Sequence, residues 1–213
     1  MLPSVPVRRG GQWQQALNLL RAMPKVKVQP NAISYNAAIS ACEKGRQWQQ
    51  ALNLFEAMAN AKLQPNVISY NAAISACEKC GQWQHALKLF EAMLEAKVRP
   101  TAISYNAAIS ACEKGGPWQA TLTLFEAMPT AELQPDVVGY SASTSACEKG
   151  SQWQQAWKLF EDMLNAKVQP DVISYNAAIS ACQKGGQLQQ AVRLFDAMQS
   201  ICGAWCHQLQ CGQ

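Results

Sequence analysis

Apolar residues recur along this chain at the spacing of an α-helix. The clearest example lies in residues 48–58, where positions i, i+3, i+4, i+7 and i+10 are Trp48, Ala51, Leu52, Phe55 and Met58. This spacing places all five side chains on one face of a helix, whereas a strand would send them to both of its faces. The pattern therefore predicts an amphipathic helix whose apolar face is buried against another element.

A second kind of segment, rich in small residues, stands between such helices. Pro65 and Asn66 interrupt the preceding helix, and we expect Ser69 to accept a hydrogen bond from a free amide of the first turn. The segment from Tyr70 to Lys79 contains no helix breaker before Gly81. It is predicted to form a helix of about three turns.

The two kinds of segment alternate with a period of 35 residues. The period is kept by the tryptophans Trp13, Trp48, Trp83, Trp118 and Trp153, by the cysteines Cys42, Cys77, Cys112, Cys147 and Cys182, and by the prolines Pro30, Pro65, Pro100, Pro135 and Pro170. The first helix of a pair carries small residues that let neighbours approach closely, namely Ala37, Ala38, Ala41 and Cys42. Because one pair cannot bury its apolar face alone, the period predicts an all-α solenoid of stacked helix pairs.

The repeat divides the chain into seven parts. Residues 1–31 hold the second helix of a partial repeat, residues 32–66, 67–101, 102–136 and 137–171 are full repeats, residues 172–199 are a truncated repeat, and residues 200–213 are a divergent tail. In the partial repeat we expect Trp13, Leu17 and Leu20 to lack a preceding helix that would cover part of their surface. Two interpretations of the ends stay open: further repeats in a longer parent chain, and end-to-end self-association of two copies.

Composition narrows the function classes only slightly. The chain has 213 residues, 49% of them hydrophobic, and a net charge of +4, which is mild for a protein that binds nucleic acid. Any basic surface must therefore come from the placement of charges. No stretch approaches the ~20 apolar residues of a membrane span, so no membrane partner is expected, and no targeting peptide is evident.

The nine cysteines do not form a metal-binding pattern. Five keep the repeat position, where a free cysteine behaves as a small buried hydrophobe, and this favours a reducing compartment. Cys80 stands where other repeats carry glycine. The tail holds Cys202, Cys206, Cys211 and His207 without a Cys-x-x-Cys pair, so we expect no metal site there.

No catalytic constellation stands outside the repeat. The sequence has no glycine-rich phosphate loop, no paired histidines at helical spacing and no separate carboxylate cluster. His85 is expected at the surface, and recurring neighbours such as Glu43 and Lys44 are interpreted as ordinary helix-end charge. We therefore expect no catalytic residue, no cofactor and no enzymatic activity.

One polar residue recurs inside the small-residue helix, at Asn36, Asn71, Asn106 and Asn176. Asparagine is a poorer helix former than alanine by roughly 0.5 kcal/mol. Helix capping would explain it, but the serines two residues earlier are better placed for that role, at Ser34, Ser69, Ser104 and Ser174. The asparagine amide is therefore expected to face outward, where its donor and acceptor can read the edge of a base.

These features together resemble the pentatricopeptide repeat in its P-type form. The resemblance covers Gln12 to about Met198 and rests on the motifs ISYNAAISACEKG, WQQALNLFEAM and KLQPN. The tetratricopeptide repeat has a period of 34 residues, which this spacing excludes. The resemblance implies a right-handed α-solenoid that binds single-stranded RNA at one base per repeat. It also implies a role in the stabilisation, processing or translation of RNA in a chloroplast or mitochondrion.

In this family the fifth residue of a repeat contacts the base and the last residue helps to select it. The resemblance assigns C to Asn36 with Asn66, a pyrimidine (Y) to Asn71 with Thr101, U to Asn106 with Asp136, and G to Ser141 with Asp171. Asn176 favours a pyrimidine, and its partner position is Cys206 in the divergent tail. The predicted core is 5′-C-Y-U-G-3′. The last residues are also ordinary helix-entry residues, so an alternative structural role stays open for them.

The resemblance gives roles to two further rows of residues. The aliphatic residues that sandwich each base correspond to Ile33, Ile68, Ile103, Val138 and Ile173, and the lysines near the phosphates correspond to Lys44, Lys79, Lys114, Lys149 and Lys184. Structural alternatives stay open for both rows. The aliphatic residues would pack on the neighbouring repeat, and the lysines would favour the helix dipole.

The fourth full repeat, residues 137–171, departs most from the pattern. Gly139 removes the expected capping serine, and Ser143 and Thr144 stand where earlier repeats are apolar. We predict that this repeat is the least stable. For the chain as a whole, a protein-binding scaffold without RNA binding is the alternative function class.

Overall fold

The computed structural model describes residues 12–196 and 198. The helices are α1 (Gln12–Ala22), α2 (Ala32–Lys44), α3 (Trp48–Asn60), α4 (Val67–Lys79), α5 (Trp83–Glu95), α6 (Ala102–Gly115), α7 (Trp118–Thr130), α8 (Val137–Lys149), α9 (Trp153–Asn165) and α10 (Val172–Lys184). A 3-10 turn (η1, Met23–Val26) follows α1, and residues 188–196 are also helical. No strand occurs in the described residues. The chain forms two compact units, Met1–Gly115 and Gly116–Gln213.

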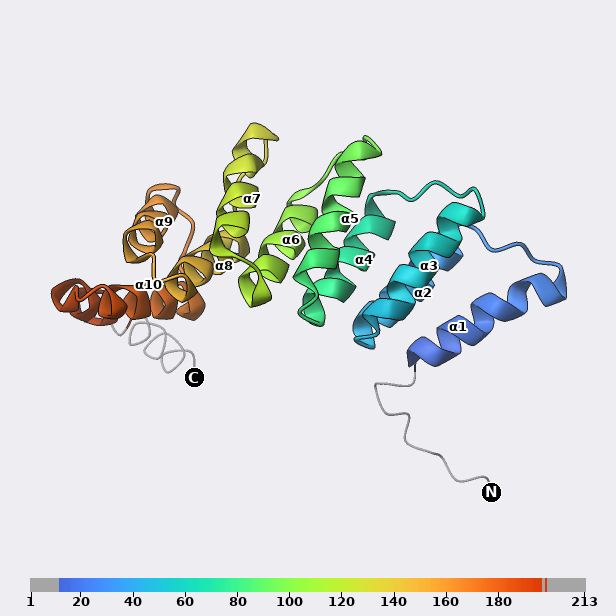
Figure 1. The fold of residues 1–213 in the computed structure, drawn as a ribbon, viewed down its shortest axis with the longest axis horizontal. Coiled ribbons are helices and arrows are strands. Elements are labelled where there is room, and N and C mark those ends of the chain that lie inside the picture. Colours follow the sequence, from blue (N-terminus) through green and yellow to red (C-terminus); the bar gives the residue numbers. More distant parts are fainter. Residues whose placement is uncertain (1–11, 197, 199–213) are drawn as a thin grey trace, which may run out of the picture. The chain divides into compact units, whose positions relative to one another are not determined.

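The first unit is a two-layer stack of antiparallel helix pairs (Figure 1). In one layer α2 packs on α4, and α4 packs on α6. In the other layer α1 contacts α2, α3 lies against α2 and α4, and α5 lies against α4 and α6. Each helix therefore buries its apolar face only against its neighbours along the chain, as a solenoid requires.

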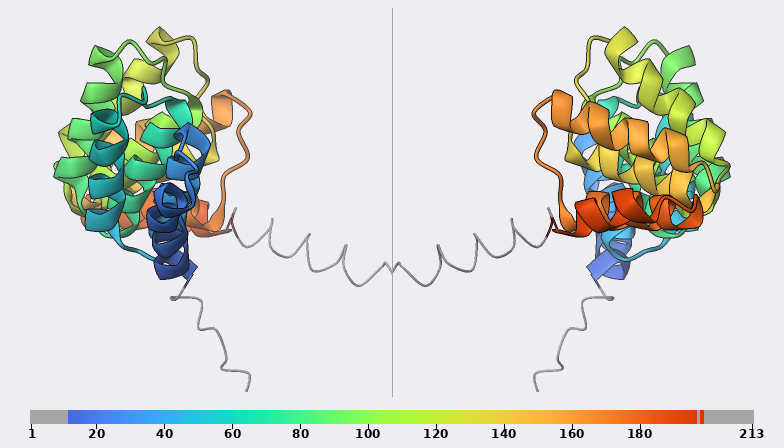
Figure 2. Two further views of the ribbon diagram at one scale, coloured as in Figure 1. Left: turned by 90° about the vertical axis from the view of Figure 1, so that its right-hand side faces the viewer. Right: turned by 90° about the vertical axis from the view of Figure 1, so that its left-hand side faces the viewer.

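The second unit repeats this arrangement. Helix α8 packs on α10, α7 packs on α8, and α9 lies against both α8 and α10. Figure 2 shows α9 and α10 of this unit from the end of the stack. The predicted all-α solenoid of stacked helix pairs is confirmed. No helix in the described part of the chain is long and apolar enough to span a membrane.

The first helices begin three residues earlier than the sequence indicated. Helix α4 begins at Val67, because Asn66 is its N-cap and accepts hydrogen bonds from the amides of Ile68 and Ser69, both at 3.1 Å. The Ser69 hydroxyl in turn accepts a hydrogen bond from the amide of Asn66 at 3.2 Å, which completes a capping box. The expectation that Ser69 is the cap was wrong: the last residue of the preceding repeat caps the helix. Asn31 caps α2 in the same way.

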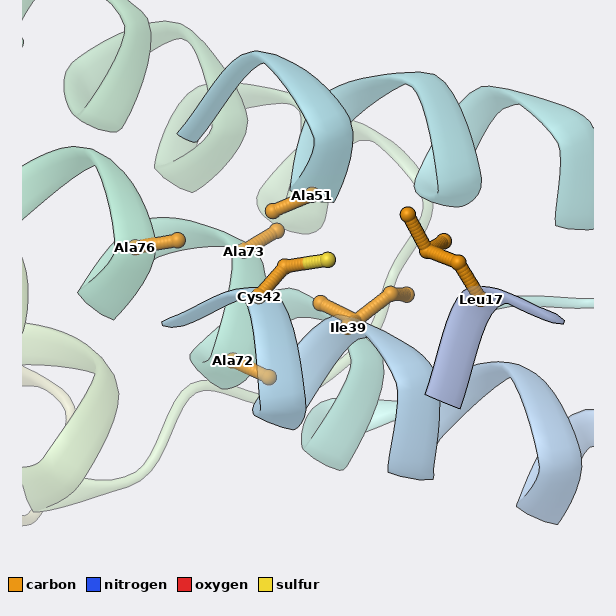
Figure 3. Packing of buried hydrophobic residues seen from close by; sticks show 7 residues of the cluster. All are labelled: Leu17, Ile39, Cys42, Ala51, Ala72, Ala73 and Ala76. Atoms are coloured by element: carbon orange, nitrogen blue, oxygen red, sulfur yellow. The ribbon is translucent and has the colours of Figure 1, made fainter. Parts of the chain in front are cut away.

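The small residues of the first helices form the core between layers. One cluster of the first unit joins Leu17, Ile39, Cys42, Ala51, Ala72, Ala73 and Ala76, and Figure 3 shows the Cys42 thiol among the alanines and Ile39. Ala38 and Cys42 are fully covered, as predicted for close helix approach, but Ala37 is exposed. Ala37 therefore contributes nothing to that approach, since it lies on the solvent side of α2.

The repeated cysteines are free and buried, at Cys42, Cys77, Cys112, Cys147 and Cys182. Burial raises the pKa of Cys77 to about 12 and the pKa of Cys112 and Cys147 to about 11. These thiols stay protonated near neutral pH and pack as small hydrophobes, as the sequence predicted. Cys202, Cys206, Cys211 and His207 lie outside the described residues.

At Gly150 and Gly185, the glycine that follows a first helix leaves room for a tryptophan of the preceding helix. A methyl group added at Gly150 would lie 2.4 Å from the Trp118 ring, and one added at Gly185 would lie 2.3 Å from the Trp153 ring. Both are closer than side-chain carbons approach. Cys80 replaces this glycine, and its thiol donates to the carbonyl oxygen of Arg46 at 3.2 Å.

Two surface expectations were wrong. His85 is half-buried, because its ring lies 4.9 Å from the Trp48 ring, measured between centroids. In the partial repeat, Leu17 and Leu20 are buried and Trp13 is half-buried, since α1 turns this face onto α2. The exposed apolar residue of α1 is instead Leu19, with 70% of its surface accessible.

Candidate functional site

The fifth residues of the repeats lie on equivalent turns of the first helices. Asn36, Asn71 and Asn106 lie on α2, α4 and α6 of the first unit, and Ser141 and Asn176 lie on α8 and α10 of the second. Asn36, Asn71 and Asn106 are half-buried, Ser141 is buried, and Asn176 is exposed. Stacking of the first helices turns the 35-residue period into one row of polar side chains within each unit.

The Asn36 amide is held by the next repeat. The Ser69 hydroxyl donates to Oδ1 of Asn36 at 2.6 Å, and the Asn36 amide nitrogen donates a long hydrogen bond of 3.4 Å to Oδ1 of Asn66. The serine hydroxyl is the donor in this bond, because the carbonyl oxygen of an amide can only accept. The carbonyl of Asn36 therefore points to Ser69, and its amino group points to Asn66.

The same geometry recurs one repeat later. The Ser104 hydroxyl donates to Oδ1 of Asn71 at 2.6 Å, and the Asn71 amide nitrogen donates to Oγ1 of Thr101 at 3.5 Å. The amide of Thr101 also donates to the Ser104 hydroxyl, at 3.0 Å. The expectation of an untethered asparagine amide was thus wrong, since both amides are oriented by a serine 33 residues further on. An amide has two N–H groups and its oxygen two lone pairs, so each asparagine keeps one donor and one acceptor position beyond these bonds.

Ser141 replaces the asparagine in the second unit and keeps the same partners. Its hydroxyl has a single proton and lies within hydrogen-bond distance of two acceptors, the carbonyl oxygen of Val137 at 2.6 Å and Oδ1 of Asp171 at 3.1 Å. The hydroxyls of Ser141 and Ser174 lie 2.7 Å apart. Asp171 caps α10 by accepting from the Ser174 amide at 2.8 Å. Burial opposes ionisation of Asp171, but the hydrogen bonds from Ser174 and Ser141 outweigh it and lower the pKa of this carboxyl.

Three of the predicted residue pairs are therefore brought together, namely Asn36 with Asn66, Asn71 with Thr101, and Ser141 with Asp171. Asn106 lies on α6 in the first unit, and Asp136 caps α8 in the second. Cys206, the partner position of Asn176, lies outside the described residues.

The last residues of the repeats also have the structural role that the sequence left open. Asn66, Asp136 and Asp171 are N-caps of α4, α8 and α10. Asn66 and Asp171 make both contacts at once, because each caps a helix and also lies within hydrogen-bond distance of a fifth residue. The cap fixes the backbone of the last residue and so fixes its distance from the fifth residue.

The predicted aliphatic row is exposed. The accessible fractions are 77% for Ile33, 59% for Ile68, 65% for Ile103, 46% for Val138 and 59% for Ile173. These residues stand near the helix starts, three positions before the fifth residues. The alternative, packing of these side chains into the neighbouring repeat, is not what the structure shows. An exposed β-branched side chain beside each oriented polar group offers an apolar surface for a planar ligand.

Three lysines of the predicted row are paired with glutamates of the preceding repeat. Within the first unit Lys79 binds Glu43 at 2.5 Å and Lys114 binds Glu78, and within the second Lys184 binds Glu148 at 2.7 Å. These lysines lie in the last turns of their helices, as the interpretation of helix-end charge expected, and the ion pairs to the preceding repeat add a contact that the sequence analysis did not predict. Lys44 and Lys149 complete the row at the ends of α2 and α8. The sequence contained a signal for these ion pairs, because the glutamate and the lysine of each pair are separated by one period plus one residue.

The glutamates of these pairs are largely covered. The side chains of Glu43, Glu78 and Glu148 are 17%, 15% and 17% accessible, whereas their lysines are 39–47% accessible. Burial opposes ionisation of Glu148, but hydrogen bonds from Lys184 and Ser180 and the nearby positive charge outweigh it and lower its pKa. The carboxylate is therefore charged at neutral pH and neutralises its lysine.

In each unit the first helices carry oriented polar side chains, exposed aliphatic side chains and lysines. The described residues contain no group of three or more His, Cys, Asp or Glu that could hold a metal ion.

Sequence comparison matches the whole repeated region. The PPR repeat family model matches residues 30–77, 65–114 and 135–184, a PPR repeat model matches residues 103–132 and 173–202, and a pentatricopeptide repeat domain model matches residues 7–45. A comparison with curated proteins found no match.

Structure comparison finds solved proteins of the same fold. The pentatricopeptide repeat protein PPR10 from maize has a TM-score of 0.68 and 25% identity over 91% of this chain, which spans 28% of the maize chain. PPR10 in complex with an 18-nucleotide psaJ RNA element has a TM-score of 0.66 and 22% identity, over 90% of this chain and 32% of that one. The PPR domain of protein-only RNase P 1 from Arabidopsis thaliana, in complex with tRNA, has a TM-score of 0.66 and 15% identity, over 79% of this chain and 95% of that one.

Proposed function

Because the chain belongs to the pentatricopeptide repeat family, we propose that it binds single-stranded RNA at one base per repeat, with the core 5′-C-Y-U-G-3′. The observation that carries this proposal is the contact between the fifth and last residues of one repeat, at Asn36–Asn66, Asn71–Thr101 and Ser141–Asp171. Two side chains that lie in contact can address the edge of one base together.

The exposed aliphatic row supports the same proposal. A base that presents its edge to Asn71 would have its faces against Ile68 and Ile103, which are exposed on successive repeats. Stacking on apolar side chains is a sequence-tolerant source of affinity for single strands, and the amide pairs add selectivity. RNA complexes of PPR10 and of the PPR domain of protein-only RNase P 1 are consistent with this use of the fold.

The cellular role that we propose is to mask or mark a transcript in a chloroplast or mitochondrion, and so to stabilise it, process it or help its translation. Four addressed positions, one of them degenerate, recur on the order of once per hundred nucleotides, so selection of one transcript needs further repeats or a partner. We propose no catalytic role for this chain.

The test is fluorescence anisotropy with labelled RNA that carries CUUG in an unstructured A-rich context. A scrambled RNA and the matching DNA serve as ligand controls. The chain is expected to bind the CUUG RNA most tightly, and Asn106→Ala is expected to weaken binding about tenfold, the effect of one lost base contact. Failure to bind any of the three ligands at low salt would contradict the proposal and favour a peptide-binding scaffold.

An exchange of specificity gives a sharper test. Ser141→Asn would pair an asparagine with Asp171. The pair Asn106 with Asp136 has the same two residue types and is assigned to U. This variant is expected to prefer CUUU over CUUG, in reverse of the parent chain. Thr123→Asn makes the same type of change on the exposed face of the second helix α7 and should leave the preference unaltered. Loss of binding without exchange would show that Ser141 contributes to affinity and not to base choice.

A further inference from the structure

The pairing of the lysine row has a consequence for how RNA is held. Lys79 and Lys114 occupy positions that would face the phosphates, yet each already binds a carboxylate of the preceding repeat, Glu43 and Glu78. Lys184 is bound in the same way by Glu148, which also accepts a hydrogen bond from Ser180 at 2.7 Å. The pattern is thus present in both units and follows the repeat.

The burial of the glutamates strengthens their electrostatic attraction to the lysines. Their side chains are no more than 17% accessible, so solvent screens them less than it screens surface carboxylates. The lysines stay 39–47% accessible, so a phosphate can approach them. It would then lie beside a charged carboxylate, and the repulsion would offset much of the attraction to the lysine.

We propose that Glu43, Glu78 and Glu148 act as specificity-determining residues, because they neutralise the lysine row and leave the bases as the main source of affinity. This inference rests on the proposed RNA binding. An RNA without the addressed bases would gain little from the phosphate contacts, so the ratio of specific to non-specific affinity would rise. The glutamates would then reduce non-specific binding of RNA to the lysine row. The net charge of the chain, only +4, also limits such binding.

The salt dependence of binding measures this directly. For single strands, the logarithm of the binding constant falls with the logarithm of salt concentration by about 0.7 for each phosphate neutralised. The parent chain is expected to show a shallower salt dependence than it would if every lysine of the row neutralised one phosphate. Glu78→Gln frees Lys114, and should steepen the slope by about 0.7 and raise the affinity for a scrambled RNA more than for the CUUG RNA.

Two further variants make the test specific. Glu91→Gln changes the net charge by the same amount at an exposed position of the second helix α5, and it should leave the slope and the affinity ratio unchanged. Lys114→Gln alone should cost little affinity, whereas in the Glu78→Gln chain it should remove the gain. The Lys114→Gln result applies even if Glu78→Gln impairs folding, which circular dichroism would detect.

The outcomes separate the two proposals. A steeper slope for Glu78→Gln but not for Glu91→Gln supports the role of the glutamates. Specific binding by the parent chain with an equal slope in Glu78→Gln overturns that role and leaves the proposed RNA binding intact, as does a large loss of affinity in Lys114→Gln alone. Absence of RNA binding by every variant at low salt overturns both.

Discussion

Leu20 stands where the four full repeats carry phenylalanine, at Phe55, Phe90, Phe125 and Phe160. Each of these rings meets the tyrosine of the following first helix edge-on, with centroids 4.8–5.1 Å apart. Tyr35 has no such partner ring, and a pocket of about 380 Å³ lies beside it, lined in part by Leu17, Leu20 and Leu54. A single residue therefore explains why Tyr35 is half-buried while its later equivalents are buried.

Leu20→Phe is expected to stabilise the first unit by about 1 kcal/mol, because an edge-to-face aromatic pair contributes roughly 0.5–1.5 kcal/mol beyond area burial. Thermal unfolding followed by circular dichroism measures the change. Phe90→Leu creates the reverse situation beside Tyr105 and should destabilise the unit by a similar amount. If Leu20→Phe lowered the melting temperature, the pocket would be too small for the ring.

At the scale of the element, the helix caps determine where the first helices begin. Asn31 and Asn66 cap α2 and α4 with a neutral amide, whereas Asp136 and Asp171 cap α8 and α10 with a carboxylate. A carboxylate cap also interacts with the positive end of the helix dipole. Asp171, whose pKa is lowered in the folded chain, therefore gives the second unit a pH-dependent cap that the neutral caps of α2 and α4 cannot supply.

The pKa of Asp171 is lowered in the folded chain, so its contribution to stability is present above the ordinary aspartate range near pH 4. It is lost as the pH falls through the lower pKa of the folded state. The second unit is thus expected to melt at a lower temperature at pH 3 than at pH 6. Asp171→Asn retains a capping side chain, so it should cost less than about 1 kcal/mol at pH 6 and reduce the difference between the two pH values. An unchanged difference in this variant would assign the acid sensitivity to other carboxylates.

Helices α7 and α8 contain buried hydroxyls without hydrogen-bond partners. Thr121 and Ser143 have no accessible surface, and neither hydroxyl oxygen has a partner. They occupy the repeat positions of Ala51 and Ala73, which share one apolar cluster in the first unit. Helix α8 is capped by Asp136 without the reciprocal serine bond, because Gly139 replaces that serine. Ser143 and Gly139 lie in the fourth full repeat and support the prediction that it is the least stable, whereas Thr121 places an unpaired buried hydroxyl in the third full repeat.

Removal of either hydroxyl is expected to stabilise the second unit, since an unpaired buried hydroxyl costs about 1–3 kcal/mol. Ser143→Ala and Thr121→Val each delete the oxygen with little change in volume, and chemical denaturation measures the gain. Thr144→Val is the control, because the Thr144 hydroxyl donates to the carbonyl oxygen of Tyr140 at 2.8 Å and its removal should bring no gain. Hydrogen exchange should also be faster in α8 than in α4, and equal protection in the two helices would contradict the assignment of the weakest repeat.

At the scale of the whole molecule, each helix pair is stabilised mainly by its neighbours, so exposed apolar side chains on an outer helix offer a surface for a further helix. Leu188, Val192 and Phe195 fall on one face of the helix at residues 188–196 and are 68%, 57% and 44% accessible. In the first unit, Leu19 and Val26 are 70% and 69% accessible. These faces are the structural basis for the hypothesis of end-to-end association.

Light scattering over a concentration series is expected to show association of the chain, and Val192→Lys should weaken it by placing a charge in the apolar face. Leu94→Lys introduces the same charge at an exposed leucine of α5 and should not affect association. A parent chain that stays monomeric at all concentrations would contradict the hypothesis. It would favour the other interpretation, in which further repeats of a longer chain cover these faces.

The 35-residue period determined the architecture without any knowledge of tertiary structure. Burial of a helical face is a local pattern, and a pair that cannot complete its own core has to stack on the next pair. The buried cysteines, the all-α class and the positions of the second helices follow from that pattern. The sequence also placed the polar, aliphatic and lysine rows on the first helices, because a fixed period repeats each side chain on the same turn.

Only the tertiary structure decided which residues of different repeats meet. Ser69 was taken for a cap of its own helix, but stacking brings its hydroxyl to Asn36, 33 residues earlier, while Asn66 takes over the cap. Stacking likewise brings Lys79, which lies at the end of α4, to Glu43 of the preceding repeat. Contacts of this kind depend on the offset between neighbouring helices, which side-chain packing sets and which a period along the sequence does not contain.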